Sequence, residues 1–379
     1  MSVRRSDLFG RSAPGTAREG RRGWAGWPLC SAAAVAAGIV LLGVVGPALG
    51  HPGGWQPTGR SSVGRLSAEH SWRAATPALP RFGAARAAHS DDVGDPFILT
   101  VPRGTAADRR VRYVLLWTTD WQSNVPTAVS EDLVHWRRVA DALPVLPTWA
   151  TGSRTMTWGP SAVRVAAGWV LFYSTQEASS GLECLGRAVS DDPVGPYVDR
   201  SSRPLVCQRS LGGDIDPSVV RDERGALSLV WKNDGNARGS ATGIWHQSLS
   251  ADGLSLTGQP RRLLTADQRW EQGILEGPAM LRAAAGGWWL FYSAGAWQSN
   301  TYSTGVAWCV TVDGPCSKSR SGPLLTSAPG AISPGGLETF IDRGGRLWAS
   351  YSAFPSRPAS RAAAMAENRV LLLAPVLTR

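Results

Sequence analysis

The sequence lacks the features of fibrous, disordered and multi-span membrane proteins. Charged residues make up only 18% of the 379 residues, hydrophobic residues make up 43%, and the 43 Gly and 26 Pro follow no collagen-like period. A disordered chain would need a lower apolar fraction. Long apolar runs are also scarce, since only residues 30–49 form an uncharged stretch of membrane-spanning length. These absences exclude a coiled coil, a disordered tail protein and a polytopic membrane protein.

Phenylalanine and tyrosine are also scarce, with 7 and 6 residues, whereas the chain has 18 Trp. Trp offers a large flat apolar face with a single hydrogen-bond donor. The chain is about twice the usual length of one domain, but all-β domains routinely exceed 200 residues. Together with the frequent glycines and prolines, this composition favours a large, turn-rich globular domain.

Most of the chain lacks an excess of positive charge. The net charge is +10, but the first 90 residues hold +8 of it and leave +2 for the remaining 289. A nucleic-acid-binding domain would carry its basic patch on a folded face, among stacking aromatic side chains. We therefore expect no nucleic-acid partner, and the charge gives no support to an interaction scaffold.

The one long apolar run predicts export. Residues 30–49 are uncharged and follow three basic residues, Arg18, Arg21 and Arg22. This order is typical of a signal segment whose start stays in the cytoplasm. The small residues Ala48 and Gly50 fit signal-peptidase cleavage, but the run is also long enough to remain as an anchor. A buried core helix is the weaker alternative, because it does not explain the basic flank.

These features divide the chain into three parts. Residues 1–50 are interpreted as a signal peptide or signal anchor, and residues 51–87, rich in Gly, Pro and Arg, as a disordered linker. Residues 88–379 form the exported domain. We expect it outside the cell, secreted or anchored to the outer face of the plasma membrane, with membrane contact only through residues 30–49 if they are not cleaved. We expect a monomer.

Histidine and cysteine are too sparse for a zinc site. Only His135 and His246 of the five His follow residue 89, so the short ligand spacings of zinc sites are missing. Four cysteines follow the apolar run, an even number that fits two disulfides in an exported protein. Three pairings are open, and we favour the two that join neighbours in sequence, Cys184–Cys207 and Cys309–Cys316.

A long repeat begins near residue 88. Short aromatic and β-branched runs recur, and the marker aromatics within them are 56, 58, 61 and 59 residues apart. The markers are Trp117, Tyr173, Trp231, Tyr292 and Tyr351. Periods of 40–60 residues built from short strands are typical of β-propeller blades. Five repeats fill residues 88–379, so the sequence predicts an all-β fold, a five-bladed β-propeller.

A second series precedes the marker runs and predicts where the innermost strands begin. It consists of residue pairs that contain proline, which suits the first residue of a strand. The pairs are Asp95-Pro96, Gly159-Pro160, Asp216-Pro217, Gly277-Pro278 and Pro334-Gly335.

Three of these strand starts carry an acid: Asp95, Asp216 and Glu276. Inner strands of a propeller converge on one axis, so the three carboxyl groups should share one pocket, where burial and mutual repulsion separate their pKa values. General acid–base catalysis needs such a separation. Any single Asp-Pro could be ordinary turn chemistry, but three in register with the repeat favour a catalytic site.

The motifs VGDPFIL, GDIDPSVV and ILEGPAM resemble the three acidic motifs of glycoside hydrolase family 43, a family of arabinanases, arabinofuranosidases and β-xylosidases. The segments SEDLVHW (130–136), TWGPSAV (157–163) and WKNDGN (231–236) are also similar to family sequences. The resemblance covers residues 88–352.

The resemblance implies an exported inverting glycoside hydrolase. Asp95 would be the general base that activates water, Glu276 the general acid that protonates the glycosidic oxygen, and Asp216 would tune and orient Glu276. An inverting pair leaves room for water, with carboxyl groups roughly 6.5–9.5 Å apart. One alternative is a non-catalytic sugar-binding propeller at the cell surface, which would have lost an acid. Another is a retaining fructosidase, whose Asn-Asp-Pro motif would require Asn where the chain has Gly94.

The expected partner is an arabinose- or xylose-containing oligosaccharide or plant polysaccharide. Trp158 and Trp297 could stack on the sugar, with packing between blades as the alternative. Lys232 and Asn236 are plausible substrate contacts, with solvated strand ends as the alternative. The residues leave open arabinoside or xyloside specificity and exo or endo action.

We expect catalysis without a cofactor or metal. Many family members carry a His on the fifth inner strand that faces a channel cation, and Gly336 stands at that place here. A structural calcium held through Glu338, water and carbonyl groups remains an alternative. An outward-facing Glu338 is the interpretation we favour.

Overall fold

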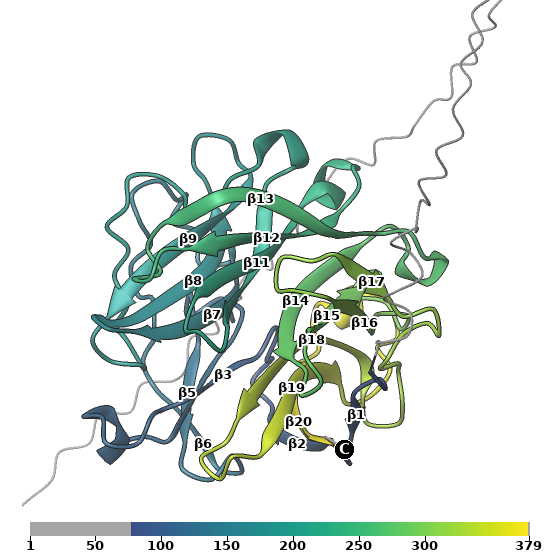
Figure 1. Ribbon diagram of the computed structural model, residues 1–379, viewed down its shortest axis with the longest axis horizontal. Helices are drawn as coiled ribbons and strands as arrows, with labels where there is room; N and C mark the ends of the chain where they lie inside the picture. The colour runs from purple at the N-terminus through teal and green to yellow at the C-terminus, as the bar shows by residue number, and fades with distance from the viewer. Residues whose placement is uncertain (1–76, 378–379) are drawn as a thin grey trace, which may run out of the picture. The chain divides into compact units, whose positions relative to one another are not determined.

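The computed structural model describes residues 77–377, and the expected signal segment and most of the expected linker lie outside this range. The described chain is almost entirely β-structure, in five sheets that follow one another in chain order (Figure 1). Its one α-helix, α1, has four residues, Arg361–Ala364. No helix between residues 77 and 377 is long and apolar enough to cross a membrane.

The first three sheets are antiparallel and run from an inner to an outer strand. The first contains β3 (Phe97–Thr100), β4 (Tyr113–Leu116), β5 (Thr127–Ser130) and β6 (Trp136–Arg138). The second contains β7 (Thr157–Val165), β8 (Gly168–Gln176) and β9 (Glu183–Ser190). The third contains β10 (Asp214–Arg221), β11 (Leu227–Asn233), β12 (Gly243–Leu249) and β13 (Leu256–Thr265).

The last two sheets complete the set. The fourth contains β14 (Leu275–Arg282), β15 (Trp288–Ala294), β16 (Ser303–Cys309) and β17 (Cys316–Lys318). The fifth contains β18 (Ile332–Ile341), β19 (Leu347–Phe354), β20 (Val370–Leu377), β1 (Arg81–Phe82) and β2 (Arg86–His89). Four short 3-10 helices lie in connections: η1 (Ala107–Arg109), η2 (Arg209–Leu211), η3 (Gly235–Arg238) and η4 (Arg269–Glu271).

The five inner strands form a closed ring. Strand β3 contacts β7, β7 contacts β10, β10 contacts β14, β14 contacts β18, and β18 contacts β3. A ring of radially arranged antiparallel sheets is a β-propeller. The predicted five-bladed β-propeller is therefore confirmed.

The fifth blade is closed by the start of the described chain. Strand β20 pairs with β19 on one side and with both β1 and β2 on the other. The propeller thus includes residues from Arg81 onward, although the sequence places its boundary at residue 88. Strands β1 and β2 are too short and too rich in Arg and Ala to show an alternating pattern, so their sequence resembles a linker.

The marker aromatics form the apolar contacts between blades. Trp117 directly follows β4, the other four lie on β8, β11, β15 and β19, and all five are at most 6% exposed. The polar ends of three of them are satisfied by buried or partly buried acids. Tyr173 donates to Asp199 (2.8 Å), Trp231 to Asp214 (2.9 Å) and Tyr292 to Glu271 (2.9 Å). The repeat of the sequence is therefore the repeat of the second strand in each blade.

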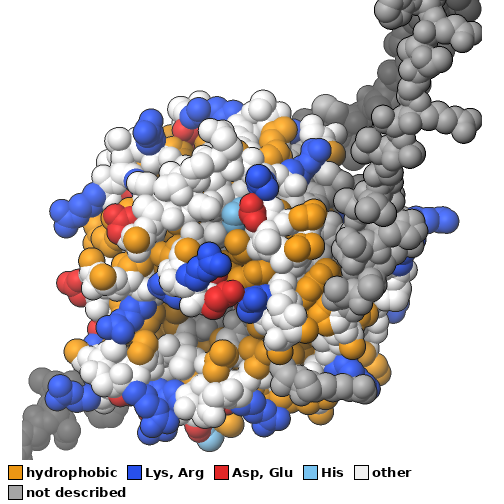
Figure 2. Space-filling view, viewed as in Figure 1, with side chains coloured by type: hydrophobic (Ala, Val, Ile, Leu, Met, Phe, Trp, Pro, Cys, Tyr) orange, Lys and Arg blue, Asp and Glu red, His pale blue; other side chains and the backbone are white. Residues whose placement is uncertain are grey.

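Two disulfides close loops within blades. Cys184 pairs with Cys207 across the outer edge of the second blade, and Cys309 pairs with Cys316 between β16 and β17. The predicted pairing is confirmed. The charges on the face in Figure 2 are mixed, and its basic side chains do not merge into one continuous patch.

Candidate active site

The inner strands share an irregularity at the centre of the ring. One residue of each blade has a positive φ there: Asp95 (49°), Gly159 (55°), Asp216 (56°), Gly277 (53°) and Gly336 (62°). The pairing register of β7, β10, β14 and β18 shifts at this point, as in a β-bulge. Asp tolerates this backbone region better than most residues, and Gly adopts it freely.

This ring corrects two details of the sequence interpretation. The prolines of β7, β10 and β14 lie inside the strands, after the bulge residue, rather than at strand starts. The fifth equivalent pair is Gly336-Leu337, two residues after Pro334-Gly335, because Gly336 has the matching backbone conformation and position. Because the residue after Gly336 is not proline, this register cannot be recognised from the sequence.

The glycines of the ring leave room for its acids. A Cβ at Gly159 would lie 2.9 Å from the Cα of Asp216, and a Cβ at Gly336 would lie 2.9 Å from Oδ1 of Asp95. Such distances are too short for a stable contact. Neighbouring inner strands therefore come this close only because each of the two aspartates faces a glycine on the preceding strand of the ring.

Asp95 is half-buried and accepts a hydrogen bond from a hydroxyl. Thr118 Oγ1 donates to Asp95 Oδ2 (2.6 Å) and accepts from the N–H of Gly159 (3.1 Å), which joins the first two blades. Burial raises the pKa of Asp95 above its ordinary value, although the nearby Arg369 guanidinium acts in the opposite direction. Asp95 therefore holds a proton more tightly than a solvated carboxylate does.

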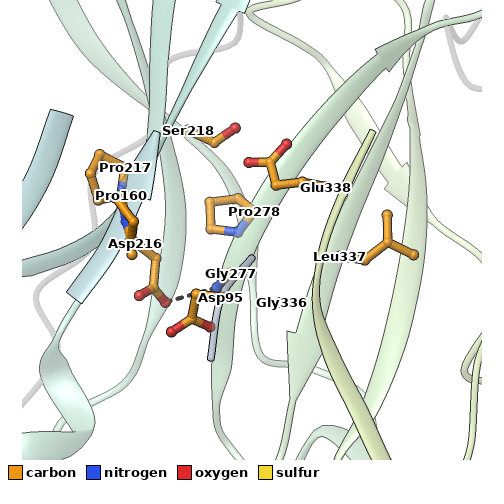
Figure 3. Close-up of a pocket in the computed structure, with 11 residues that line it drawn as sticks. Asp95, Pro160, Asp216, Pro217, Ser218, Gly277, Pro278, Gly336, Leu337 and Glu338 are labelled. Atoms are coloured by element: carbon orange, nitrogen blue, oxygen red, sulfur yellow. Dashed lines mark hydrogen bonds between the residues drawn. The ribbon is translucent and has the colours of Figure 1, made fainter. Parts of the chain in front are cut away.

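Asp216 lies two blades further round the ring than Asp95, beyond Gly159. Its Oδ2 accepts from the N–H of Gly277 (2.8 Å), drawn as a dashed line in Figure 3. Burial, with repulsion from Asp95 and Glu276, raises the pKa of Asp216 to about 8. Near neutral pH this group is therefore largely protonated.

Glu276 precedes the bulge residue Gly277 on β14, so it is offset by one position from the two aspartates. Tyr302 donates its hydroxyl to Glu276 Oε1 (2.7 Å), and Lys232 Nζ contacts Oε2 (3.0 Å). Both oxygens of the acid are thus fixed by groups from neighbouring strands. The three predicted acids meet at one end of the central channel, as their repeat positions predict.

The channel behind the acids is narrow. A cavity of about 30 Å³ is lined by the ring residues and by Ser218, Leu337 and Glu338. In Figure 3, Asp95 and Asp216 lie at one end of this cavity, while Glu338 and Ser218 lie at the other. Glu338 therefore faces the channel and not outward. The shared bulge between Gly335 and Glu338 gives Glu338 the place on β18 that Ser218 has on β10, and both side chains line the cavity.

These residues do not offer a convincing cation site. In the described range, the one set of three close potential ligands is Glu177 with Cys184 and Cys207, whose sulfurs are joined in a disulfide. Glu338 is hydrogen-bonded by Ser218 and a backbone amide, and burial raises its pKa to about 7. The channel residues thus do not fit a tightly held hard cation, which prefers several oxygen ligands.

The four predicted substrate contacts differ in position. Trp158 is half-buried on β7 and donates its N–H to Thr155 O (3.2 Å). Trp297 is half-buried, stacks on Phe354 and lies under the Arg369 guanidinium, 4.8 Å from its ring centroid. Asn236 is exposed on η3.

Lys232 is not a solvated strand end. Its side chain is 1% exposed, and its ammonium contacts Glu276 Oε2 and Asp234 Oδ1 (3.3 Å). Burial alone would lower the pKa of Lys232, but the nearby carboxylates, Glu276 first, outweigh burial and raise it.

Three residues at the site are not singled out by the sequence. Tyr302 and Arg369 lie outside the repeated motifs, and Thr118 follows the marker Trp117 in the first repeated run. All three reach the acids only through the fold. Trp121, in the same β4–β5 connection as Thr118, is 63% exposed, unlike the packed Trp side chains that the sequence leads us to expect. A side chain at Gly94 would overlap the Arg369 guanidinium, which explains the glycine before Asp95.

Known proteins with similar sequences were found in one family. The family described as "Glycosyl hydrolases family 43" matches residues 92–378. A β-D-galactofuranosidase, xynD, of Aspergillus niger is 28% identical over 51% of this chain and 54% of its own length. An extracellular exo-alpha-(1->5)-L-arabinofuranosidase, ArbA, of Cellvibrio japonicus is 25% identical over 58% of this chain and 65% of its own length. The chain thus spans less than two thirds of either relative.

Solved structures share the fold. A thermostable family-43 glycoside hydrolase is superimposed with a TM-score of 0.65 at 23% identity, over 78% of this chain and 91% of that one. Because the family match covers residues 92–378, well over half of the 379 residues, the protein belongs to glycoside hydrolase family 43.

Proposed function

We propose that this protein is a glycoside hydrolase that inverts the configuration of the sugar it releases. Three acids from three blades, gathered at one end of the central channel, are the observation that carries the proposal. A sugar-binding propeller without catalysis has no need to gather partly desolvated carboxyl groups beside one another, because their desolvation costs free energy. Membership of a family of glycosyl hydrolases supports the same conclusion.

The contacts of the acids suggest a division of labour. Asp95, which has a raised pKa and a hydroxyl on one oxygen, is the general base that takes a proton from water. Glu276 is the general acid that protonates the leaving oxygen. Asp216 accepts from the amide that follows Glu276 and so orients this acid. The water attacks the anomeric carbon from the side opposite the leaving group, which inverts its configuration.

The substrate we propose is a pentose-containing oligosaccharide or polysaccharide. One relative is named an arabinofuranosidase. Trp121 offers an exposed, flat apolar face in the loop that carries Thr118. Sugars stack on such faces through their C–H groups. The acids alone carry the chemistry that we propose, with no metal or cofactor.

We further propose that the protein works outside the cell as a monomer. Two disulfides support an oxidising location, since cytosolic proteins rarely keep them. The named relative from Cellvibrio japonicus is extracellular.

Alanine variants of the acids test the proposed roles. Asp95→Ala, Asp216→Ala and Glu276→Ala should each lower kcat/KM for an unactivated pentoside by about 10²–10⁴-fold. Azide should partly restore activity only to Asp95→Ala, because a small anion can replace the activated water there. Asp192→Ala is the matched control, since Asp192-Pro193 is an Asp-Pro pair in a loop outside the acid pocket.

Circular dichroism and thermal melting would show that the variants remain folded. Wild-type activity of Glu276→Ala on an unactivated pentoside would disprove the assignment of the acid. Equal losses in Asp192→Ala would show that the assay reports folding and not catalysis.

A further inference from the structure

Lys232 is a charged residue inside the propeller with no path to solvent. It lies on β11 and is 1% exposed, yet the acids it touches are more accessible, with side chains 10% exposed in Asp234 and 14% in Glu276. Two of its three N–H donors are used on these acids. At most one N–H donor of Lys232 remains for a sugar, so its main partners are the acids themselves.

Glu276 lies among several titratable groups. Its neighbours on other elements are the carboxyl groups of Asp95, Asp216 and Asp234, the hydroxyl of Tyr302 and the ammonium of Lys232. Lys232 is the one cation in direct contact with Glu276 among the described residues. An ammonium at this distance favours the ionised form of a carboxyl group.

A general acid must both carry a proton and release it in the transition state. The proton must pass to the leaving oxygen, and Glu276 then becomes a carboxylate. The ammonium 3.0 Å away stabilises that product of the proton transfer. The proton becomes part of the new hydroxyl of the leaving group, while the released sugar takes its anomeric hydroxyl from water.

We propose that Lys232 is a positioning residue that keeps Glu276 able to release its proton, and that Asp234 moderates this effect by sharing the ammonium. This inference rests on the proposed function for its catalytic consequence. It assigns Lys232 to the acid and not to the substrate. The contact joins β11 to β14 across 44 residues of sequence.

Opposite substitutions should move the pH profile in opposite directions. In Lys232→Met, Glu276 loses the neighbouring ammonium and keeps its proton to higher pH. The alkaline limb of the pH profile of kcat/KM should therefore move to higher pH by about 1–3 units. In Asp234→Asn the ammonium of Lys232 contacts Glu276 alone, and one nearby negative charge is removed. The alkaline limb should therefore move to lower pH. Lys232→Arg, which keeps the charge, is the matched control and should move the limb least.

A readout without catalysis separates this inference from the proposed function. Full-length protein labelled with ¹³C at glutamate carboxyl carbons can be titrated by NMR, with the signal assigned through Glu276→Gln. The pH at which this signal changes should rise in Lys232→Met and fall in Asp234→Asn.

The outcomes are distinct. If the NMR signal shifts as expected but no glycoside is cleaved, the charge coupling stands and the proposed function fails. Suppose instead that the enzyme is active. The role of Lys232 is disproved if Lys232→Met and Asp234→Asn leave the NMR signal and the alkaline limb in place, or if both variants move them in the same direction. If Lys232→Met does not fold, Asp234→Asn and Lys232→Arg still decide between these results.

Discussion

At the scale of the residue, Arg369 is the group that tunes the proposed base. Its guanidinium lies near Asp95, pairs with Asp92 (3.1 Å) and stacks on Trp297. A nearby cation favours the ionised form of Asp95, which is the form that can accept a proton from water. Burial acts in the opposite direction and is the larger effect, because the pKa of Asp95 is raised overall.

This balance predicts a pH dependence. The base works only when Asp95 is ionised, so the acid limb of kcat/KM should lie above the ordinary pKa of aspartate, about 3.9. Arg369→Leu removes the stabilising cation and raises the pKa of Asp95 further, so the acid limb should move up by about 1–2 pH units. Initial rates from pH 3 to pH 9 on one substrate would measure the shift.

Arg369→Lys is the control, because it keeps the charge but loses the planar contact with Trp297. An acid limb that stays in place in Arg369→Leu, with only KM changed, would mean that Arg369 binds sugar and does not tune Asp95.

The three acids are predictable from sequence because each accompanies a repeated Gly or Pro signal that marks an inner strand. Thr118 and Tyr302 carry no such signal, since their contacts with Asp95 and Glu276 span 23 and 26 residues and depend on how strands return to the mouth. Lys232 can be singled out in the sequence, but the acid with which it forms an ion pair lies on another blade. The sequence therefore shows the residue without its role.

At the scale of the element, the acids are placed by the bulges of β7, β10, β14 and β18 and by the matching backbone conformation of Asp95 before β3. The positive φ of Asp95 and Asp216 turns these residues toward the axis, and glycines on the neighbouring strands give them space. The bulges themselves are not predicted by the sequence, because a proline pair is compatible with both a strand start and a bulge. The residue after Gly336 is not proline, so the sequence interpretation places the fifth motif two residues too early.

A pair of glycine substitutions tests the ring. Gly159→Ala and Gly225→Ala both place a side chain at positive φ, 55° and 83°, which costs about 1–2 kcal/mol of stability in each. Only the Cβ at position 159 meets Asp216, 2.9 Å from its Cα, whereas the one at 225 has no heavy atom within 4 Å. We expect kcat/KM to fall by about 10- to 100-fold in Gly159→Ala alone.

Thermal melting and initial rates, measured on the same two preparations, would separate stability from activity. Equal activities in the two folded variants would show that the close approach of β7 and β10 does not position Asp216.

At the scale of the whole molecule, closure of the ring makes one site from distant motifs. The sequence predicts the number of blades because each blade repeats the same second strand, marked by a buried aromatic. It does not predict that β1 and β2 complete the fifth blade, because these strands are short and their partner β20 is nearly 300 residues away. Strand β2 also contacts the first blade, since Arg86 donates to Leu133 O (2.9 Å).

We propose that the acids which this closed ring brings together catalyse an inverting hydrolysis. The most direct measurement is ¹H NMR of the sugar first released from aryl α-L-arabinofuranosides, aryl β-D-xylosides, linear arabinan and xylan, followed before mutarotation. We predict that at least one of these substrates is cleaved and that the new anomer has the configuration opposite to that of the substrate. A first product that retains the configuration of its substrate would contradict the assignment of Asp95 as a base that activates water.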